Sequence, residues 1–268
     1  MRFLFLKVLV KVWWLVSFGW LRRKKVLFPI AEVVKLQSER DGRLERVLEE
    51  ADPEELYYAV SMIFLETSFK EVTALLKDSN LRSPILNSNI DILALEFALY
   101  YLTRVQLTID VKIEEHLDGW MFENELDYGS EDELFEAAEE HREELDKKYL
   151  VPIKSAVFFL EALYSQYYQS DMVEVHIRDA TKAYWNILFN KDSAPHELFL
   201  LRFKSCLGMR EFPLSKERVR EANKPAIELD LSLSAFVMIS EKEMFPVLYK
   251  VLDTLFEKFL GNKFPYYS

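Results

Sequence analysis

The sequence predicts a mainly α-helical fold, and three observations support this. Half of the 268 residues are apolar and 14% are aromatic, which is enough to build a packed core. Only six residues are glycine, whereas sheet-rich folds need glycine at turns and bulges. Capping signals also recur along the chain. We therefore expect a compact multi-helix domain of about eight to ten helices joined by short polar loops.

Helix starts and ends can be assigned in chain order. Asp52-Pro53 places an N-cap before a proline at the first helical position. Three S-x-x-E pairs have the spacing of a capping box, in which two side chains satisfy two free N–H groups. These pairs are Ser68 with Glu71, Ser130 with Glu133, and Ser240 with Glu243. Pro195 begins a further helix, and Gly208 and Gly261 stand where helix-ending glycines are expected.

Three runs favour strands instead, because apolar and polar residues alternate along them. They cover 105–114, 172–178 and 227–234, and the first is rich in β-branched residues. Alternation of this length also arises by chance in a chain that is half apolar. An α+β fold with a small antiparallel sheet made of these runs is therefore the alternative.

Charge divides the chain into three parts. Residues 1–25 carry seven basic side chains and no acidic one, while residues 114–148, the acidic belt, carry 15 acidic and 3 basic ones. We expect 1–25 to pack on or beside a single helical domain formed by 26–268. A subdomain boundary, if there is one, falls near the loop 127–130. A net charge of −11 makes nucleic acid a poor direct partner.

The first 25 residues allow several interpretations. A membrane span is disfavoured because Lys11 would lie near the bilayer centre, at a cost of about 2.5–3.5 kcal/mol. Lysines also interrupt the apolar region that a signal peptide needs. A core helix with lysines at its edge and a helix lying on an anionic membrane both remain. The expected membrane contacts are Lys7, Lys11, Trp13, Trp14, Trp20, Arg22, Arg23, Lys24 and Lys25.

Residues 130–148 form the most acidic predicted helix. Side chains of an expected buried stripe recur every three or four residues, at Leu134, Ala138, His141, Leu145 and Tyr149. Like charges four residues apart destabilise such a helix slightly, so the acids serve either solubility or the docking of a basic partner. The predicted partner-binding residues are Glu131, Asp132, Glu133, Glu136, Glu139, Glu140, Glu143 and Glu144.

The usual catalytic signatures are missing. No two glycines lie close together, which excludes a P-loop, a dinucleotide-binding turn and a G-x-S-x-G elbow. The four histidines lack metal-binding spacing, and the single cysteine, Cys206, is expected to be a buried thiol in a reducing compartment. His116, His141 and His176 each have a carboxylate two or three residues away, which predicts ordinary ion pairs. No metal or cofactor is expected.

The sequence therefore favours a non-enzymatic helical interaction module or adaptor in the cytoplasm, binding a basic protein through helix 130–148. An immunity-like inhibitor is the sharpest form of this hypothesis. One alternative is a structural subunit held at the inner face of a membrane by residues 1–25. A second is a metal-dependent hydrolase whose site combines distant histidines and carboxylates. The oligomeric state is open.

Overall fold

The computed structural model describes residues 29–41, 55–77, 79–189, 195–212 and Lys250. Predictions for 1–25, 227–234, Asp52, Ser240 and Gly261 lie outside these ranges. The described part is helical and contains no strand, which confirms the mainly α prediction. Its elements are α2 (Pro29–Asp41), α4 (Leu56–Leu75), α5 (Ser79–Leu86), α6 (Ile90–Asn124), α7 (Glu131–Leu145), the π-helical turn η1 (Asp146–Leu150), α8 (Val151–Tyr168), α9 (Met172–Phe189) and α10 (Pro195–Cys206).

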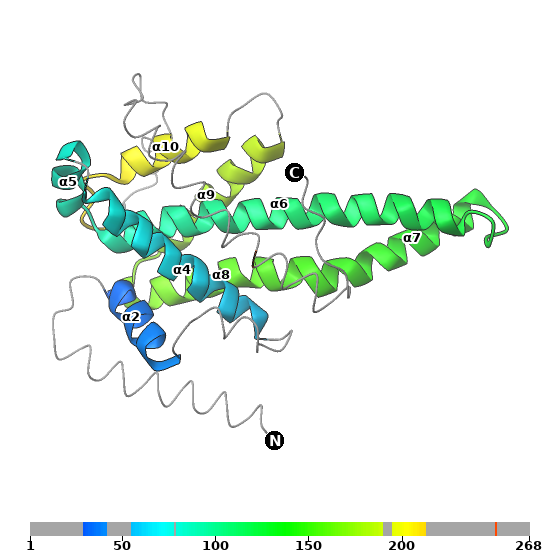
Figure 1. Ribbon diagram of the computed structural model, residues 1–268, viewed down its shortest axis with the longest axis horizontal. Coiled ribbons are helices and arrows are strands. Elements are labelled where there is room, and N and C mark those ends of the chain that lie inside the picture. The colour runs from blue at the N-terminus through cyan, green and yellow to red at the C-terminus, as the bar shows by residue number, and fades with distance from the viewer. Residues whose placement is uncertain (1–28, 42–54, 78, 190–194, 213–249, 251–268) are drawn as a thin grey trace.

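The long helix α6 is the centre of the fold. Its N-terminal half is enclosed by α4, α8, α9 and α10, and every residue from Asp91 to Thr103 is buried (Figure 1). Within the described part, α6 is the one helix long and apolar enough to cross a membrane, and most of its apolar segment is buried among the other helices. Core helices and membrane spans share this composition.

The C-terminal half of α6 pairs with α7. The two helices run side by side away from the remaining helices and are joined by a short turn, which Figure 1 shows at its right-hand end. After α7 the helical path continues through η1 into α8. Residues 90–168 therefore form a long helical hairpin. We call the part in which the C-terminal half of α6 packs against α7 the α6–α7 hairpin.

Aromatic side chains fill the core where α6 meets α10. Phe199 lies 4.7 Å from Phe97 and 4.8 Å from Tyr100, measured between ring centroids. Phe203 lies 5.2 Å from Phe97 at a steep angle between the rings. These offset and edge-on arrangements each add about 0.5–1.5 kcal/mol beyond the burial of the rings.

The alternative sheet is wrong for two of its three runs. Residues 105–114 belong to α6, where Val105, Ile109 and Ile113 are buried at a spacing of four. Val111, which alternation would place on the same face as those three, is 47% exposed. The helical period therefore fits the burial better than the period of two.

Residues 172–178 belong to α9 and follow the same rule. Val173, Ile177, Ala180 and Tyr184 are buried at spacings of three and four residues. The apparent alternation arose because His176, a polar residue, is also buried on this face. The run 227–234 lies outside the described residues.

The capping predictions had mixed outcomes. Ser130 is the N-cap of α7, and its Oγ accepts from the Glu133 N–H at 3.3 Å, as expected. Ser68 is not a cap, because α4 continues through it and its hydroxyl donates to the Phe64 carbonyl at 2.6 Å. Gly208 follows α10 with a φ of +83°, a conformation that favours glycine and confirms the predicted helix end.

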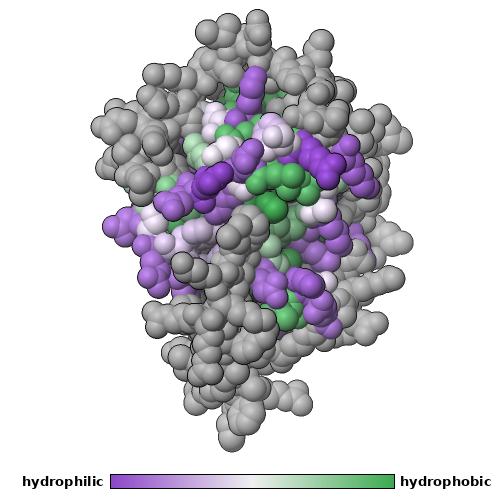
Figure 2. Space-filling model, turned by 90° about the vertical axis from the view of Figure 1, so that its left-hand side faces the viewer, coloured by the Kyte–Doolittle hydropathy of each residue, from purple (hydrophilic) through white to green (hydrophobic). Residues whose placement is uncertain are grey.

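The end of the molecule that carries α5 has a mixed surface. Figure 2 shows apolar atoms gathered in a band with hydrophilic side chains on either side. Among the residues of α5, Leu81 and Ile85 are buried, and Leu86 is 61% exposed. Leu86 therefore adds exposed apolar surface to this end of the molecule.

Candidate functional site

The predicted partner-binding acids all lie on the exposed surface of α7. Their helix packs on α6 through a stripe that contains the buried Leu134, Ala138 and Leu145, and Tyr149 continues the stripe in η1. His141 is half-buried at the same seam. The eight exposed acids are Glu131, Asp132, Glu133, Glu136, Glu139, Glu140, Glu143 and Glu144.

Apolar side chains are exposed beside these acids, a feature that the sequence analysis missed. Phe122 near the end of α6 is 81% exposed, Leu126 in the connecting turn is 97% exposed, and Phe135 on α7 is 51% exposed. We call this end of the hairpin, residues 122–135, the hairpin tip. Six acidic side chains belong to the tip, and no basic residue lies between 122 and 135. The six are Glu123, Glu125, Asp127, Glu131, Asp132 and Glu133.

Few basic groups offset the acids of the hairpin in the described structure. Arg142 of α7 reaches across to α6, where it binds Glu114 and lies 3.5 Å from the Asp110 carboxylate. The hydrogen bond with Glu114 raises the pKa of Arg142, so the guanidinium stays protonated. Lys147 lies 3.5 Å from Glu143, and both side chains are well exposed. Most of the acidic surface toward the tip is thus left for solvent or a partner.

Two histidines meet where α6 and α7 pack together. The Nε2 atoms of His116 and His141 are 3.3 Å apart, and the Trp120 ring lies 5.2 Å from the His141 ring. Burial and the neighbouring His141 lower the pKa of His116. His141 Nδ1 lies 3.9 Å from Glu144 Oε2, as the sequence spacing predicted. The sequence gave no sign of the His116–His141 contact, because 25 residues separate them.

A second cluster, the buried polar centre, joins α6, α9 and α10. Glu96 of α6 is fully buried and accepts from Arg202 of α10 at 3.0 and 3.1 Å, one bond to each oxygen. The Tyr184 hydroxyl donates to it at 2.5 Å, and His176 Nε2 lies 2.7 Å away. Arg202 also reaches Asp179 at 3.0 Å.

Electrostatics keep the buried Glu96 carboxylate ionised. Burial raises the pKa of Glu96, but the Arg202 charge and the contacts with His176 outweigh burial and hold that pKa far below its usual range. The expected pair of His176 with Asp179 is replaced, because His176 turns to Glu96 and Asp179 binds Arg202. The Glu96 charge is paired with the Arg202 charge, which is the condition for burying both.

The buried polar centre is poorly suited to hold a metal. Ligand atoms of Glu96, His176 and Cys206 lie within 4.8 Å of one another, and all three residues are buried. However, both oxygens of Glu96 already accept hydrogen bonds from Arg202, so a cation would have to displace a buried guanidinium. Burial also raises the pKa of Cys206 well above its usual value, which keeps the thiol protonated. This geometry stabilises the fold.

Another buried carboxylate, Asp91, holds the start of α2. It accepts from the backbone N–H groups of Ile30 at 2.9 Å and Ala31 at 3.1 Å, and from the Tyr168 hydroxyl at 2.7 Å. Burial raises the pKa of Asp91 to about 6, although the hydrogen bonds it accepts oppose the increase. Asp91 therefore ties α2 and α8 to the first turn of α6.

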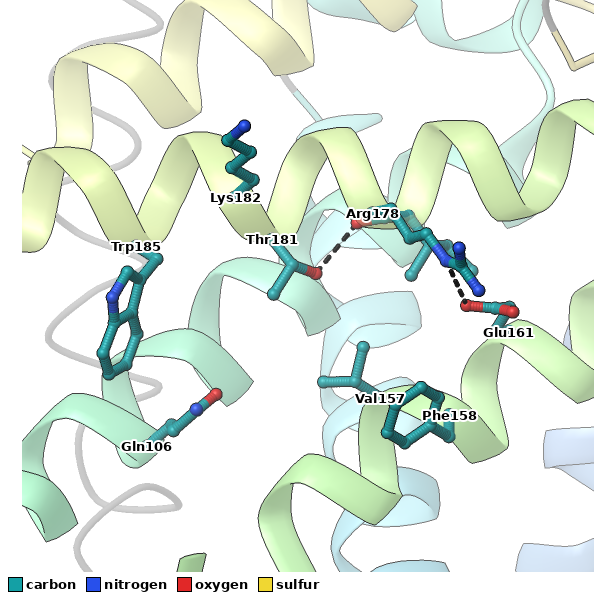
Figure 3. A pocket seen from close by; sticks show the side chains of 9 residues that line it. Gln106, Val157, Phe158, Glu161, Arg178, Thr181, Lys182 and Trp185 are labelled. Carbon is teal, nitrogen blue, oxygen red and sulfur yellow. Dashed lines mark hydrogen bonds and ion pairs between the residues drawn. The ribbon is translucent and has the colours of Figure 1, made fainter.

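A surface hollow of about 500 Å³ lies between α6, α8 and α9. Figure 3 shows Trp185 and Lys182 of α9 on one side of it and Phe158 of α8 on the other. Arg178 lies 3.7 Å from Glu161 across the hollow and 2.7 Å from Glu174 on its own helix. The hollow is open to solvent, and Glu161, the acid that lines it, is already paired with Arg178. Its side chains therefore do not form a catalytic arrangement.

Of the predicted sites, the structure thus brings the acids of α7 together on one exposed surface. The membrane contacts predicted for residues 1–25 lie outside the described residues. Comparison with known proteins adds no assignment: no family model, curated protein or solved structure matches the chain.

Proposed function

We propose that this protein is a non-enzymatic interaction module that docks a basic protein partner on the tip of the α6–α7 hairpin. The observation that carries the proposal is the exposure of Phe122 and Leu126, at 81% and 97%, among acidic side chains. Large apolar side chains that project from a charged surface are typical of interaction sites.

Apolar and acidic groups would have separate tasks in such an interface. Phe122 and Leu126 can enter pockets of the partner and provide most of the binding free energy, since a few buried anchors dominate most interfaces. The surrounding acids steer a basic partner toward the tip and reject acidic proteins. The partner therefore has an apolar pocket rimmed by lysine or arginine.

The hairpin presents this surface on a stable support. Ile113 and Leu117 of α6 and Leu134 and Ala138 of α7 are buried between the two helices. The Ser130 cap and the bond from the Gly129 N–H to Glu133 at 3.1 Å fix the start of α7. Binding then costs little ordering of the backbone, which favours affinity.

An immunity-like inhibitor that neutralises a basic toxin in the cytoplasm is the most specific form of this proposal. A dense acidic surface with apolar anchors suits a small basic enzyme whose own substrate is anionic. This form requires a complex of one copy of each protein, formed rapidly and weakened by salt.

Photo-crosslinking in cells that express the full chain would test the proposal. A photoreactive amino acid is placed at position 126 in the tip or, as the control, at position 86, where Leu86 is also exposed at 61%. We expect position 126 to capture one basic protein that position 86 does not. That protein is then purified, and its complex with the full chain is measured at low and high salt.

Two results would overturn the proposal. One is the absence of any protein specific to position 126 in cells that contain the chain's natural partners. The other is a captured protein that is acidic or whose affinity for the chain does not change with salt, because the acids of the tip would then have no role.

A further inference from the structure

The geometry points to a binding site for a divalent transition-metal ion, best matched to Zn²⁺, between His116 of α6 and His141 of α7. It is independent of the docking proposal and concerns the seam of the hairpin. The two imidazoles face each other with their Nε2 atoms 3.3 Å apart. Imidazole nitrogens are the commonest protein ligands for zinc, copper and nickel.

The separation of the two nitrogens matches a shared metal ion. Zn²⁺ binds histidine nitrogen at about 2.0–2.1 Å with tetrahedral angles, so two ligands of one ion lie roughly 3.3–3.4 Å apart. His116 and His141 already have this spacing. An ion placed to one side of the line between the two nitrogens can therefore bind both, with little movement of either helix.

A carboxylate lies near the second ring nitrogen of His141, on Glu144. A histidine that binds metal through Nε2 carries its proton on Nδ1 and usually donates it to a carboxylate. His141 Nδ1 lies 3.9 Å from Glu144 Oε2, on the side of the ring away from His116. The Trp120 ring packs at 5.2 Å from the His141 ring and restricts its rotation.

The electrostatic environment also favours a cation. The exposed acids of the belt attract divalent ions to this part of the surface. The nearest described arginine on α7, Arg142, is engaged by Glu114 and Asp110, so its charge is offset. Two histidines fill two of four tetrahedral positions. Water molecules, or a side chain from a docked protein, can fill the others.

Such an ion would link two helices. His116 and His141 lie on opposite sides of the hairpin turn, so the ion closes a loop that includes the tip. Binding to the folded state alone raises stability in proportion to the logarithm of the metal concentration divided by Kd.

The test uses Zn²⁺ itself and the full chain freed of metal by a chelator. Isothermal titration measures stoichiometry and Kd, and thermal unfolding measures the shift in Tm. We expect one Zn²⁺ per chain and a rise in Tm that Mg²⁺ does not produce. The variants His116→Gln and His141→Gln should each lose most of the affinity. Glu144→Gln removes a well-exposed charge 3.9 Å from His141 Nδ1 and should weaken binding by no more than about fivefold.

Two control variants separate this site from other sources of binding. Asp171→Asn removes an exposed acid in the turn between α8 and α9, and we expect the Kd to stay within about twofold of the original. Cys206→Ser alters the other group of candidate ligands, around Glu96, and should leave Zn²⁺ binding unchanged. Co²⁺ bound in place of Zn²⁺ should give a spectrum without thiolate-to-metal charge transfer.

The inference is overturned if Zn²⁺ does not bind, or if it binds equally to the original chain and to both histidine variants. It is also overturned if Cys206→Ser abolishes binding, because the ion would then occupy the buried cluster. Circular dichroism of each variant verifies that a loss of binding is not a loss of folding.

Discussion

Arg202 donates to both oxygens of Glu96, with Nε 3.1 Å from one oxygen and Nη2 3.0 Å from the other, and both side chains are sealed from solvent. This fork joins the last described helix, α10, to the central helix α6. The pairing has the planar, bidentate geometry that arginine forms best with carboxylates. Tyr184 and His176 occupy further positions around the same carboxylate.

Arg202→Met should destabilise the fold by about 3–5 kcal/mol, because it leaves the buried charge of Glu96 without its partner. Arg178→Met is the matched control. Arg178 also contacts two acids, Glu161 and Glu174, but its side chain is 64% exposed. This control should cost less than about 1 kcal/mol. Urea unfolding of both variants provides the comparison, and equal losses would show that the buried fork has no special weight.

Asp91 should make the protein less stable as pH rises from about 4 to about 6. Its pKa is about 6 in the folded chain and 3.8 without the fold, so the folded state holds the proton more tightly. This contribution is complete below pH 3.8 and is lost as pH rises through 6. The difference corresponds to about 3 kcal/mol.

Glu96 acts in the opposite direction at lower pH. Its folded pKa is depressed, so its contribution is complete above about pH 4.5 and is lost as pH falls. Urea unfolding between pH 4 and pH 7.5 should therefore show a free energy of unfolding that falls up to about pH 6 and then levels off. Asp91→Asn should flatten that slope while lowering stability at pH 5, and an unchanged slope in this variant would contradict the assignment to Asp91.

Cys206 should react with thiol reagents only when the structure opens. Its side chain is 1% exposed, and burial raises the pKa of the thiol. Labelling of the native chain should be at least about a thousandfold slower than labelling of the unfolded chain in denaturant. Rapid labelling of the native protein would show that α10 opens readily from α6.

The double change Phe122→Ser and Leu126→Ser should alter the unfolding free energy by less than about 0.5 kcal/mol, because both side chains are mostly in solvent. Leu134→Ser is the contrast. Leu134 is buried between α6 and α7, so removing it should destabilise the hairpin clearly. Thermal unfolding and hydrogen exchange of the three chains would show whether the tip is dispensable for folding.

Sequence patterns predicted the helical class because caps and apolar spacing act locally. The stripe of Leu134, Ala138 and Leu145 and the Ser130 cap are found as expected. The prediction of a helix cap at Ser68 was wrong because α4 continues through this residue in an apolar segment. Packing there overrides the local capping signal. The alternative prediction of a strand at 105–114 was wrong because alternation and helical spacing overlap in a mostly apolar segment.

The contacts between distant residues could not be predicted in the same way. Glu96 is a single charge in an apolar run, which signals a buried ion pair but does not identify Arg202 as its partner. His116 and His141 meet only because α6 and α7 pack in one register. Phe122 and Leu126 are exposed because the other described helices do not reach the tip. The local spacing of residues cannot predict this arrangement.

We propose that the tip of the α6–α7 hairpin binds a basic protein. The most direct measurement is the Kd of the protein captured at position 126 for the original full chain and for the Phe122→Ser, Leu126→Ser chain. Anchors of this kind contribute about 2 kcal/mol or more, so the double variant should bind at least about 30-fold more weakly. An affinity equal to that of the original chain, with folding intact, would contradict the claim.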